Sequence, residues 1–168
     1  MLSRNKTARL IIAVLIASIA ESAFAAPPAA GQLAPDFTIS LAGSPNNRKK
    51  LSEYRGKPVV LHFWASWCGP CVRELPLIAD ITSPGANDFA VIAVNCQEPE
   101  KVASDFLAKR KLRLNLAMDT NGAISALYGI NAIPQTFMID SEGVIRSVRV
   151  GAYTAKTLTA DVAALLSK

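Results

Sequence analysis

The stretch Trp67-Cys68-Gly69-Pro70-Cys71 constrains the fold more than any other part of this 168-residue chain. It follows an apolar run, residues 58–64, that predicts a buried strand, and it precedes residues 72–81, which predict a helix. Two residues between two cysteines at a helix start bring both sulfur atoms within reach of one small disulfide ring. The stretch therefore predicts an α/β fold in which a strand leads into a helix that carries a cysteine pair.

The start of a helix favours sulfur chemistry. Its unpaired backbone N–H groups and the positive end of its dipole both stabilise a thiolate over a thiol. Cys68 is therefore the expected attacking sulfur, and Cys71, three residues later on the same helix face, is the expected resolving sulfur. Gly69 lets the chain turn, and Pro70 suits a first helical turn. The chemistry predicted is dithiol–disulfide exchange.

Two other interpretations of the cysteine pair are a zinc site and a structural disulfide. A structural zinc site of the usual kind needs four ligands, commonly cysteine or histidine. The chain has three cysteines and one histidine, so a closed site would need carboxylates. We therefore expect redox exchange, with no metal and no cofactor.

The beginning of the chain has the pattern of an export signal. Arg4, Lys6 and Arg9 precede an uncharged run, residues 10–20, and Ala23-Phe24-Ala25 is a small-residue cleavage pattern. The pattern predicts a signal peptide, residues 1–25, and a periplasmic or secreted protein. The run is short for a membrane span, and an uncleaved membrane anchor is the alternative.

The remainder is expected to form one domain. Without residues 1–25 the chain keeps 15 basic and 12 acidic residues, a net charge of +3, which is ordinary for a soluble domain. The dense basic cluster of residues 48–50 is not interleaved with aromatic residues, so no nucleic-acid partner is expected. We predict a flexible lead-in, residues 26–32, and a single domain, residues 33–168, that is a monomer.

Strand and helix patterns alternate along this domain and predict a mixed α/β sheet. Predicted strands are residues 33–41, 49–51, 58–64, 89–94, 112–118, 135–140 and 144–150, the first two joined by a turn at residues 43–47. Predicted helices are residues 72–81, residues 99–109 with Pro99 at the first position, residues 121–128, and residues 154–168.

Several motifs together resemble the exported TlpA/ResA-like thioredoxin family. They are Gly31-Gln32-Leu33-Ala34-Pro35-Asp36-Phe37, residues 51–60, Phe63-Trp64-Ala65-Ser66-Trp67-Cys68-Gly69-Pro70-Cys71, Glu74-Leu75-Pro76, and residues 129–140. The resemblance runs from about Gly31 to the C-terminus. It implies a thioredoxin fold with an N-terminal β-hairpin extension and an inserted strand-helix unit.

The same resemblance assigns substrate contacts. It implies that the Ile133–Pro134 peptide bond is cis and faces the cysteines, and that the backbone of Ile133 pairs with a substrate segment. A trans loop proline is the alternative, since most X–Pro bonds are trans. Trp67 is expected to cover the disulfide and offer an apolar contact to partners; the alternative is a core residue.

Glu74 occupies the position where the family commonly carries a glutamate near the active site. Its carboxylate is expected to exchange the proton of Cys71, because the resolving thiol must ionise before it attacks. A capping or surface carboxylate is the alternative. His62 lies six residues before Cys68, where the family often has asparagine. An imidazole beneath Cys71 could act as a base or add positive charge, and a hydrogen-bonded core histidine is the alternative.

Cys96 follows a predicted strand and could therefore face the active-site end of the sheet. It could trap oxidised intermediates or pair between molecules, but an inert small core residue is the more frequent role.

These features favour an exported thiol-disulfide oxidoreductase that reduces protein disulfides. The Gly-Pro pair between the cysteines is that of thioredoxin, whose potential of about −270 mV lies far below that of the oxidant DsbA. The resemblance suggests apocytochrome c or another periplasmic disulfide as substrate, and a membrane thiol-electron donor as partner. A disulfide oxidant of the same fold and a Cu(I)-handling module are the alternatives.

A peroxidase is the other enzyme class considered, because Ala34-Pro35-Asp36-Phe37 also resembles the start of peroxiredoxins. Their Pro-x-x-x-Thr-x-x-Cys pattern would place proline at position 61 and threonine at position 65. The chain has Leu61 and Ala65 there, which excludes that peroxidase centre.

Overall fold

The computed structural model describes residues 26–40, 42, 48–82 and 88–167. In these ranges the chain forms a two-stranded sheet and a five-stranded mixed sheet. The strands are β1 (Thr38–Ser40), β2 (Arg48–Lys50), β3 (Val59–Trp64), β4 (Ala90–Cys96), β5 (Leu116–Asp119), β6 (Gln135–Ile139) and β7 (Ile145–Val150). The helices are the 3-10 turn η1 (Leu51–Tyr54), α1 (Gly69–Thr82), α2 (Glu100–Lys109), α3 (Ala123–Leu127) and α4 (Ala155–Leu166).

Strand β3 is the centre of the large sheet, whose order is β5-β4-β3-β6-β7. It pairs in parallel with β4 and antiparallel with β6, and all six of its residues are buried. A strand buried on both faces needs an almost continuous apolar sequence, which is what residues 58–64 provide. The fold predicted from the resemblance is confirmed: an α/β thioredoxin-like fold with an N-terminal hairpin of β1 and β2.

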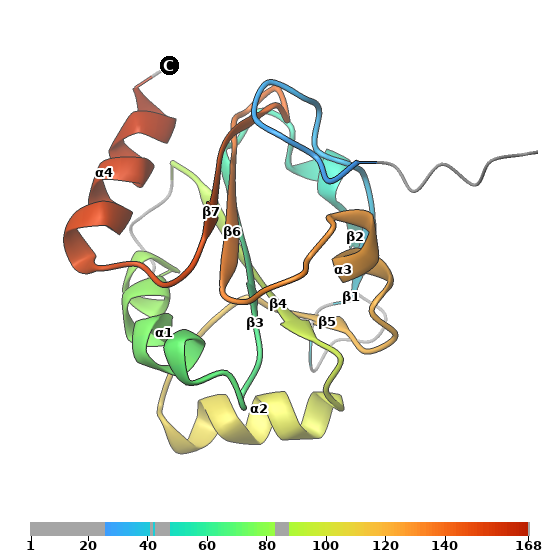
Figure 1. Ribbon diagram of the computed structural model, residues 1–168, viewed down its shortest axis with the longest axis vertical. Helices are drawn as coiled ribbons and strands as arrows, with labels where there is room; N and C mark the ends of the chain where they lie inside the picture. Colours follow the sequence, from blue (N-terminus) through green and yellow to red (C-terminus); the bar gives the residue numbers. More distant parts are fainter. Residues whose placement is uncertain (1–25, 41, 43–47, 83–87, 168) are drawn as a thin grey trace, which may run out of the picture.

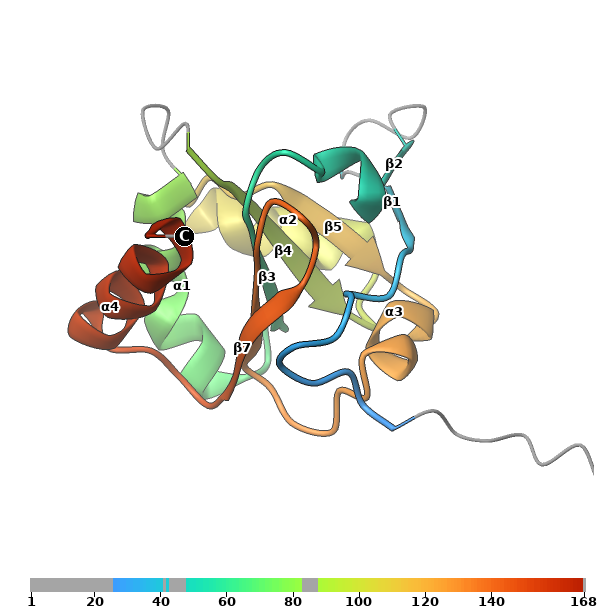
Figure 2. The ribbon, with the colours of Figure 1, turned by 90° about the horizontal axis from the view of Figure 1, so that it is seen from above.

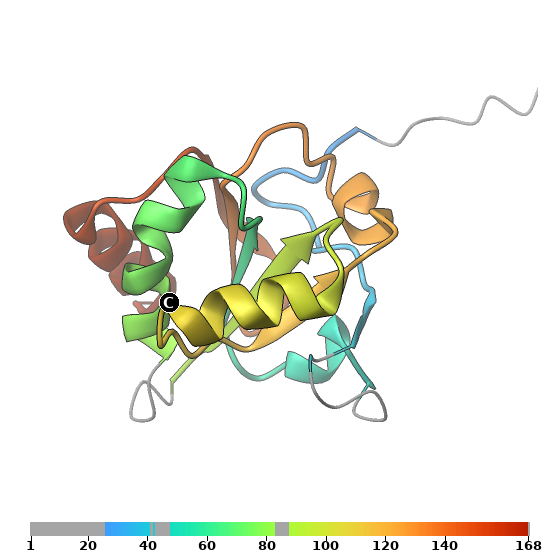
Figure 3. The ribbon, with the colours of Figure 1, turned by 90° about the horizontal axis from the view of Figure 1, so that it is seen from below.

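Two helical layers cover the large sheet. Helices α1, α2 and α4 pack on one face, and α3 with the N-terminal segments packs on the other (Figures 1 and 2). Seen from below, α2 lies in front of the sheet, beside α1 (Figure 3). The segment between β4 and β6 contains α2, β5 and α3, and β5 extends the sheet at the β4 edge.

The face covered by α3 has an aromatic core. The ring of Tyr128 lies 5.0 to 5.6 Å from those of Phe37, Phe63 and Phe137, mostly edge to face. The Tyr128 hydroxyl donates to the carbonyl oxygen of Pro35 at 2.8 Å. Tyr128 therefore ties the N-terminal segment to the sheet through both apolar contact and one hydrogen bond.

The predicted strands and helices begin or end one to five residues away from the observed ones, and three of these differences are instructive. Strand β1 covers only Thr38–Ser40, because Pro35 has no N–H and the Asp36 carboxylate binds the N–H and hydroxyl of Ser52. Strand β5 begins at Leu116 rather than at residue 112, because residues 112–115 cross over from the end of α2. Pro99 is the N-cap of α2 and not its first helical residue.

The lead-in, residues 26–32, lies against the domain. Pro28 is buried, the Gly31 N–H donates to the Ile145 carbonyl at 2.8 Å, and the Ile145 N–H donates to the Gln32 carbonyl at 2.9 Å. Composition alone predicted a flexible segment, because alanine, proline and glycine give no packing signal. The predicted signal peptide and the turn at residues 43–47 fall outside the described ranges. Among the described helices, none combines the length and apolarity that a membrane span requires.

Shortening Tyr128 tests how the N-terminal segment is held. We expect Tyr128→Phe to lower the free energy of unfolding by about 1 kcal/mol, because one hydrogen bond is lost. Tyr128→Ala should lower it by about 4 kcal/mol, because a buried aromatic side chain also leaves a cavity. Urea unfolding of the oxidised protein measures both values, and equal losses for the two variants would contradict the packing role.

Candidate active site

Cys68 and Cys71 form a disulfide at the first turn of α1, where β3 ends. Their Cα atoms are 5.2 Å apart, Cys68 is 5% exposed, and Cys71 is fully buried. Of the two cysteines, only Cys68 keeps any solvent-exposed surface.

The sulfur of Cys68 occupies the place of an N-cap acceptor. The Cys71 N–H donates to Cys68 Sγ at 3.2 Å, and the Val72 N–H donates to the Cys68 carbonyl at 3.0 Å, which starts the helix. An N-cap side chain that accepts the N–H of the third helical residue satisfies one of the unpaired donors. The same bond and the helix dipole favour negative charge on Cys68 once the disulfide is open.

The loop before β6 faces the disulfide. The Ile133–Pro134 peptide bond is cis, as the resemblance implies. Cys68 Sγ lies 3.5 Å from the carbonyl oxygen of Ile133. Ile133 is half-buried and Pro134 is buried, so this loop forms one wall beside Cys68 Sγ.

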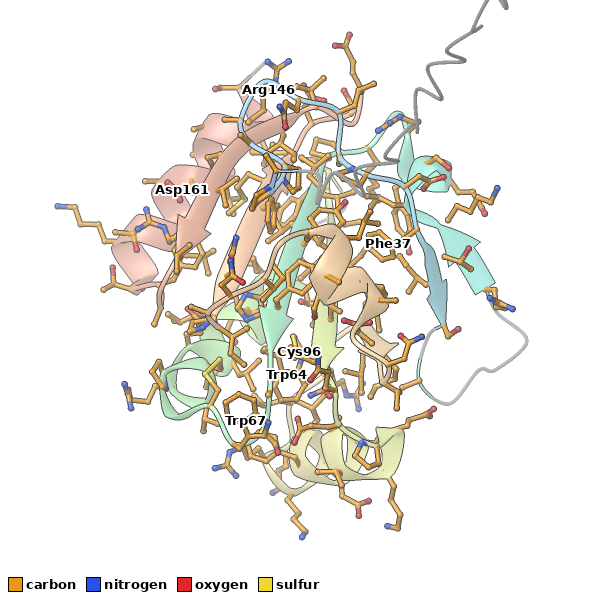
Figure 4. All side chains as sticks on the ribbon, turned by 45° about the vertical axis from the view of Figure 1, so that its right-hand side comes forward. Phe37, Trp64, Trp67, Cys96, Arg146 and Asp161 are labelled. Atoms are coloured by element: carbon orange, nitrogen blue, oxygen red, sulfur yellow. A yellow bond between two sulfur atoms is a disulfide. The ribbon has the colours of Figure 1, made fainter. Side chains whose placement is uncertain are left out.

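Trp67 and a cavity adjoin the same loop. Trp67 is 71% exposed, which excludes the alternative of a core residue. A cavity of about 370 Å³ is lined by Trp67, Cys96, Gln97, Ser125, Ile130, Asn131, Ala132 and Ile133. Figure 4 shows Trp67 and Cys96 at the same end of the sheet. The surface around Cys68 thus combines an exposed aromatic ring, a hollow and a loop backbone.

Cys96 is a free, buried thiol at the end of β4. Its sulfur lies 3.6 Å from Ser125 Oγ, and burial raises the pKa of the thiol to about 11. A thiol held neutral at physiological pH is a poor nucleophile. Although Cys96 lines the cavity, its environment is that of a packed core residue.

A buried carboxylate that the sequence did not single out holds the loop before Cys68. Glu98 accepts hydrogen bonds from the N–H and the hydroxyl of Ser66 and, at 2.6 Å, from the Asn95 side-chain amide. Glu98 is 6% exposed, and Asn95 is fully buried. The network joins the end of β4 to the loop that enters α1. An acidic residue just past a buried strand is the signal that could have pointed to it.

Glu74 lies one helical turn after Cys71 and is 1% exposed, so it is neither a surface nor a capping carboxylate. Burial raises its pKa to about 7, although the hydrogen bond that its Oε2 accepts from the Tyr153 N–H opposes this shift. A carboxyl group with a pKa near neutrality can both accept and return a proton. Its environment therefore suits the proton exchange expected of it.

The polar atoms of His62 face Thr136 and Glu74. Its Nδ1 lies 2.9 Å from Thr136 Oγ1, and its Nε2 lies 3.5 Å from Glu74 Oε1. The ring is fully buried, and burial lowers its pKa to about 3. The imidazole is therefore neutral near pH 7 and adds no positive charge beside the cysteines. Thr136 was not singled out from the sequence, because its pairing with His62 across β3 and β6 is a tertiary contact.

Among the described residues, no group of three or more histidine, cysteine, aspartate or glutamate side chains is arranged to hold a metal ion. The buried ionisable groups near the cysteines are a carboxyl group and an imidazole. The arrangement can attack a disulfide with one sulfur, resolve the product with the other, and move a proton through a buried carboxyl group.

Comparison with known proteins agrees with this chemistry. Residues 29–166 match the family model described as Redoxin. The chain is 36% identical to thioredoxin-like protein YneN of Bacillus subtilis, over 76% of this chain and 75% of that protein. It is 33% identical to thiol-disulfide oxidoreductase ResA of Geobacillus thermodenitrificans, over 77% of this chain and 74% of that protein.

A solved structure shows the same fold. The Chlorobium tepidum protein assigned as the thiol:disulfide interchange protein DsbE superposes with a TM-score of 0.74 and 32% identity. The match covers 84% of this chain and all of that one. The two proteins thus share one architecture over most of this chain.

Removing the Glu98 carboxylate tests the support of the active-site loop. Glu98→Ala leaves three donors of Ser66 and Asn95 without their acceptor, and we expect a loss of about 3 kcal/mol in unfolding free energy. Amide hydrogen exchange at Ser66 should accelerate in parallel. The exposed Glu142→Ala is the control variant. An unchanged exchange rate at Ser66 would show that the network does not hold the loop.

Replacing Glu74 with glutamine tests its buried protonation. A raised carboxyl pKa stabilises the fold fully below the ordinary value of 4.5, and this contribution is lost as the pH rises through about 7. The unsubstituted protein should lose about 2–3 kcal/mol of unfolding free energy from this group between about pH 5 and pH 9, and Glu74→Gln should not. The difference in unfolding free energy between the variant and the unsubstituted protein should therefore shift by that amount in favour of the variant. Urea unfolding of the oxidised proteins at both pH values measures this, with exposed Glu142→Gln as control. The same stability difference at both pH values would contradict the raised pKa.

Proposed function

The chain belongs to the Redoxin family and is a thiol-disulfide oxidoreductase, and we propose that it reduces protein disulfides outside the cytoplasm through Cys68 and Cys71. The observation that carries the proposal is the position of Cys68 Sγ: an N-cap acceptor at the start of α1, 3.5 Å from the Ile133 carbonyl oxygen. The proposed location follows from the export pattern of residues 1–25.

The proposed cycle begins with the reduced pair. The Cys68 thiolate attacks one sulfur of a target disulfide, a mixed disulfide forms, and the second target sulfur leaves as a thiolate. The Cys71 thiol then gives its proton to Glu74, and its thiolate attacks Cys68 Sγ. This forms the Cys68–Cys71 disulfide and releases the first target sulfur, so two electrons have passed to the target. A membrane thiol-electron donor is the proposed partner that restores the dithiol.

The surroundings of Cys68 supply the proposed substrate contacts. Cys68 is 5% exposed whereas Cys71 is fully buried, which supports Cys68 as the attacking sulfur and Cys71 as the resolving one. An extended target segment is proposed to lie along the backbone of Ile133, beside the cis-proline, and to contact the exposed ring of Trp67. An exposed aromatic side chain next to a hollow is a common feature of protein-binding surfaces.

The direction of electron flow rests on the residues between the cysteines. Gly69 and Pro70 are the pair found in thioredoxin, with a potential of about −270 mV, against about −120 mV for the oxidant DsbA. The Cys71 N–H donates to the Cys68 sulfur and so stabilises the reduced form, which is the property of an oxidant. One backbone hydrogen bond is too small an effect to set the direction. We therefore propose reduction as the direction.

Two cysteine variants and the redox potential test this function. Cys68→Ser should abolish insulin reduction, since no attacking sulfur remains, whereas Cys71→Ser should accumulate a mixed disulfide at Cys68. Equilibration of the unsubstituted protein with thiol–disulfide buffers should give a potential near about −270 mV. A potential near that of DsbA would reverse the direction to oxidation. Insulin reduction that survives Cys68→Ser would overturn the whole assignment.

A further inference from the structure

Two buried polar atoms near the cysteines face each other without forming a hydrogen bond. They are Nε2 of His62 in β3 and Oε1 of Glu74 in α1, 3.5 Å apart. Buried polar groups are usually satisfied, so such a pair calls for a physical reason. The gap exceeds an ordinary hydrogen bond of about 2.9 Å by about half an ångström, a distance that a small side-chain rotation closes.

The other polar atoms of both side chains are anchored. Glu74 Oε2 accepts the N–H of Tyr153, which lies between β7 and α4. His62 Nδ1 lies 2.9 Å from Thr136 Oγ1 in β6. Each side chain is thus held at one end, and the two free ends point at each other. The result is a chain of three side chains, Thr136, His62 and Glu74, that links β6, β3 and α1.

These three side chains can form two alternative arrangements of hydrogen bonds, which differ in the ring nitrogen that carries the hydrogen. A neutral imidazole has one donor and one acceptor nitrogen, a hydroxyl group can donate or accept, and a carboxyl group donates only when it is protonated. When Glu74 is protonated, its O–H can donate to Nε2 while Nδ1–H donates to Thr136. When Glu74 is ionised, Nε2–H can donate to the carboxylate while the Thr136 hydroxyl donates to Nδ1.

We propose that His62 is a positioning residue that holds the Glu74 carboxyl group in both of its protonation states, by changing which ring nitrogen carries the hydrogen. The two protonation states differ by a single proton, which Glu74 carries in its neutral form and has lost in its ionised form. The ring of His62 keeps one hydrogen in both. The inference deepens the proposed function, because Glu74 is the group proposed to take the proton of Cys71.

Burial is consistent with this assignment. His62 is fully buried and Glu74 is 1% exposed, so either side chain would be costly to ionise alone. Burial raises the pKa of Glu74 to about 7 and lowers that of His62 to about 3. Glu74 therefore changes its charge near neutral pH, and the ring stays neutral throughout. A neutral ring can keep a hydrogen bond to Glu74 in both states by exchanging its tautomer.

Arg149 and Asp161 both contact Tyr153, whose N–H binds Glu74, and they pair with each other. On β7 and α4, Arg149 Nη2 lies 3.2 Å from Asp161 Oδ2, and the Tyr153 hydroxyl donates to the same oxygen at 3.0 Å. Their opposite charges cancel beside the sheet. On α1 itself, Cys71 is in the disulfide in the oxidised protein. In that state, Glu74 is the group in contact with His62 that titrates near pH 7.

Nitrogen NMR of the oxidised protein tests the proposal directly. His62 is the only histidine in the chain, so an untagged protein labelled with ¹⁵N at histidine shows one imidazole. We expect hydrogen on Nδ1 near pH 5 and on Nε2 near pH 9, with the same midpoint as the ¹³C titration of the Glu74 carboxyl group. A single tautomer across this range, or conversion of the ring to imidazolium, would overturn the proposal.

Glu74→Gln is the matched control, because its amide does not titrate. In this variant the ring should keep one tautomer from about pH 5 to pH 9. A tautomer change that persists near pH 7 would show that Glu74 does not drive it. Because these spectra are recorded on the disulfide form, they do not depend on the direction of electron transfer. A failed insulin assay would thus count against the proposed function and leave this result standing.

Substitution of His62 supplies a readout that a merely structural role would not move. A hydrogen bond to an ionised group is about twice as strong as one between neutral groups. His62→Leu cannot form the proposed hydrogen bond to Glu74 in either protonation state, and the ionised form loses the stronger bond. The ¹³C titration midpoint of Glu74 should therefore rise by about one pH unit. His62→Asn, which can still donate and accept, should shift it less and remain folded if the leucine variant does not. Unchanged midpoints in both variants would contradict the positioning role.

Discussion

The structure depends on the placement of one sulfur atom at the start of a helix. Cys68 Sγ accepts the Cys71 N–H at 3.2 Å, and α1 begins at the next residue, Gly69. The bond uses a backbone donor that every helix start leaves unpaired, and it concentrates the positive end of the helix dipole on sulfur. The surrounding elements either bring the helix start to the surface or limit what can approach it.

The sheet fixes where this helix starts. Strand β3 is the central strand, buried on both faces between β4 and β6, so the position of its carboxyl end is fixed. The carboxyl ends of β3 and β4 meet there, and the Glu98 network binds the loop after β3 to the end of β4. The cis-proline loop before β6 closes the other side, 3.5 Å from the sulfur. Rigid neighbours therefore hold a reactive group that itself sits on a loop–helix junction.

Beneath this surface, ionisable groups are arranged by burial more than by charge pairing. Glu74 and His62 lie on neighbouring elements, and burial shifts their pKa values in opposite directions, so both tend toward their neutral forms at mildly acidic pH. Cys96, although it lines the cavity beside Trp67, is held as a neutral thiol by the same effect. The protein thus contains one sulfur placed for ionisation and one kept from it, and the local backbone explains the difference.

The sequence by itself determined the local chemistry and the α/β class of the fold, and its resemblance to a known family implied the thioredoxin topology. The cysteine pair, with Gly69 and Pro70 between its members, follows an apolar run and precedes a helical pattern. All of these features lie within a few residues of one another, and such short-range patterns predict local structure well. Contacts between residues far apart in the sequence were decided only by the tertiary structure. They include the hydrogen bonds of Thr136 with His62, of Ser66 with Glu98, and of the lead-in with β7. Burial and the pKa values that follow from it depend on every element that packs around a side chain, and no local pattern contains that information.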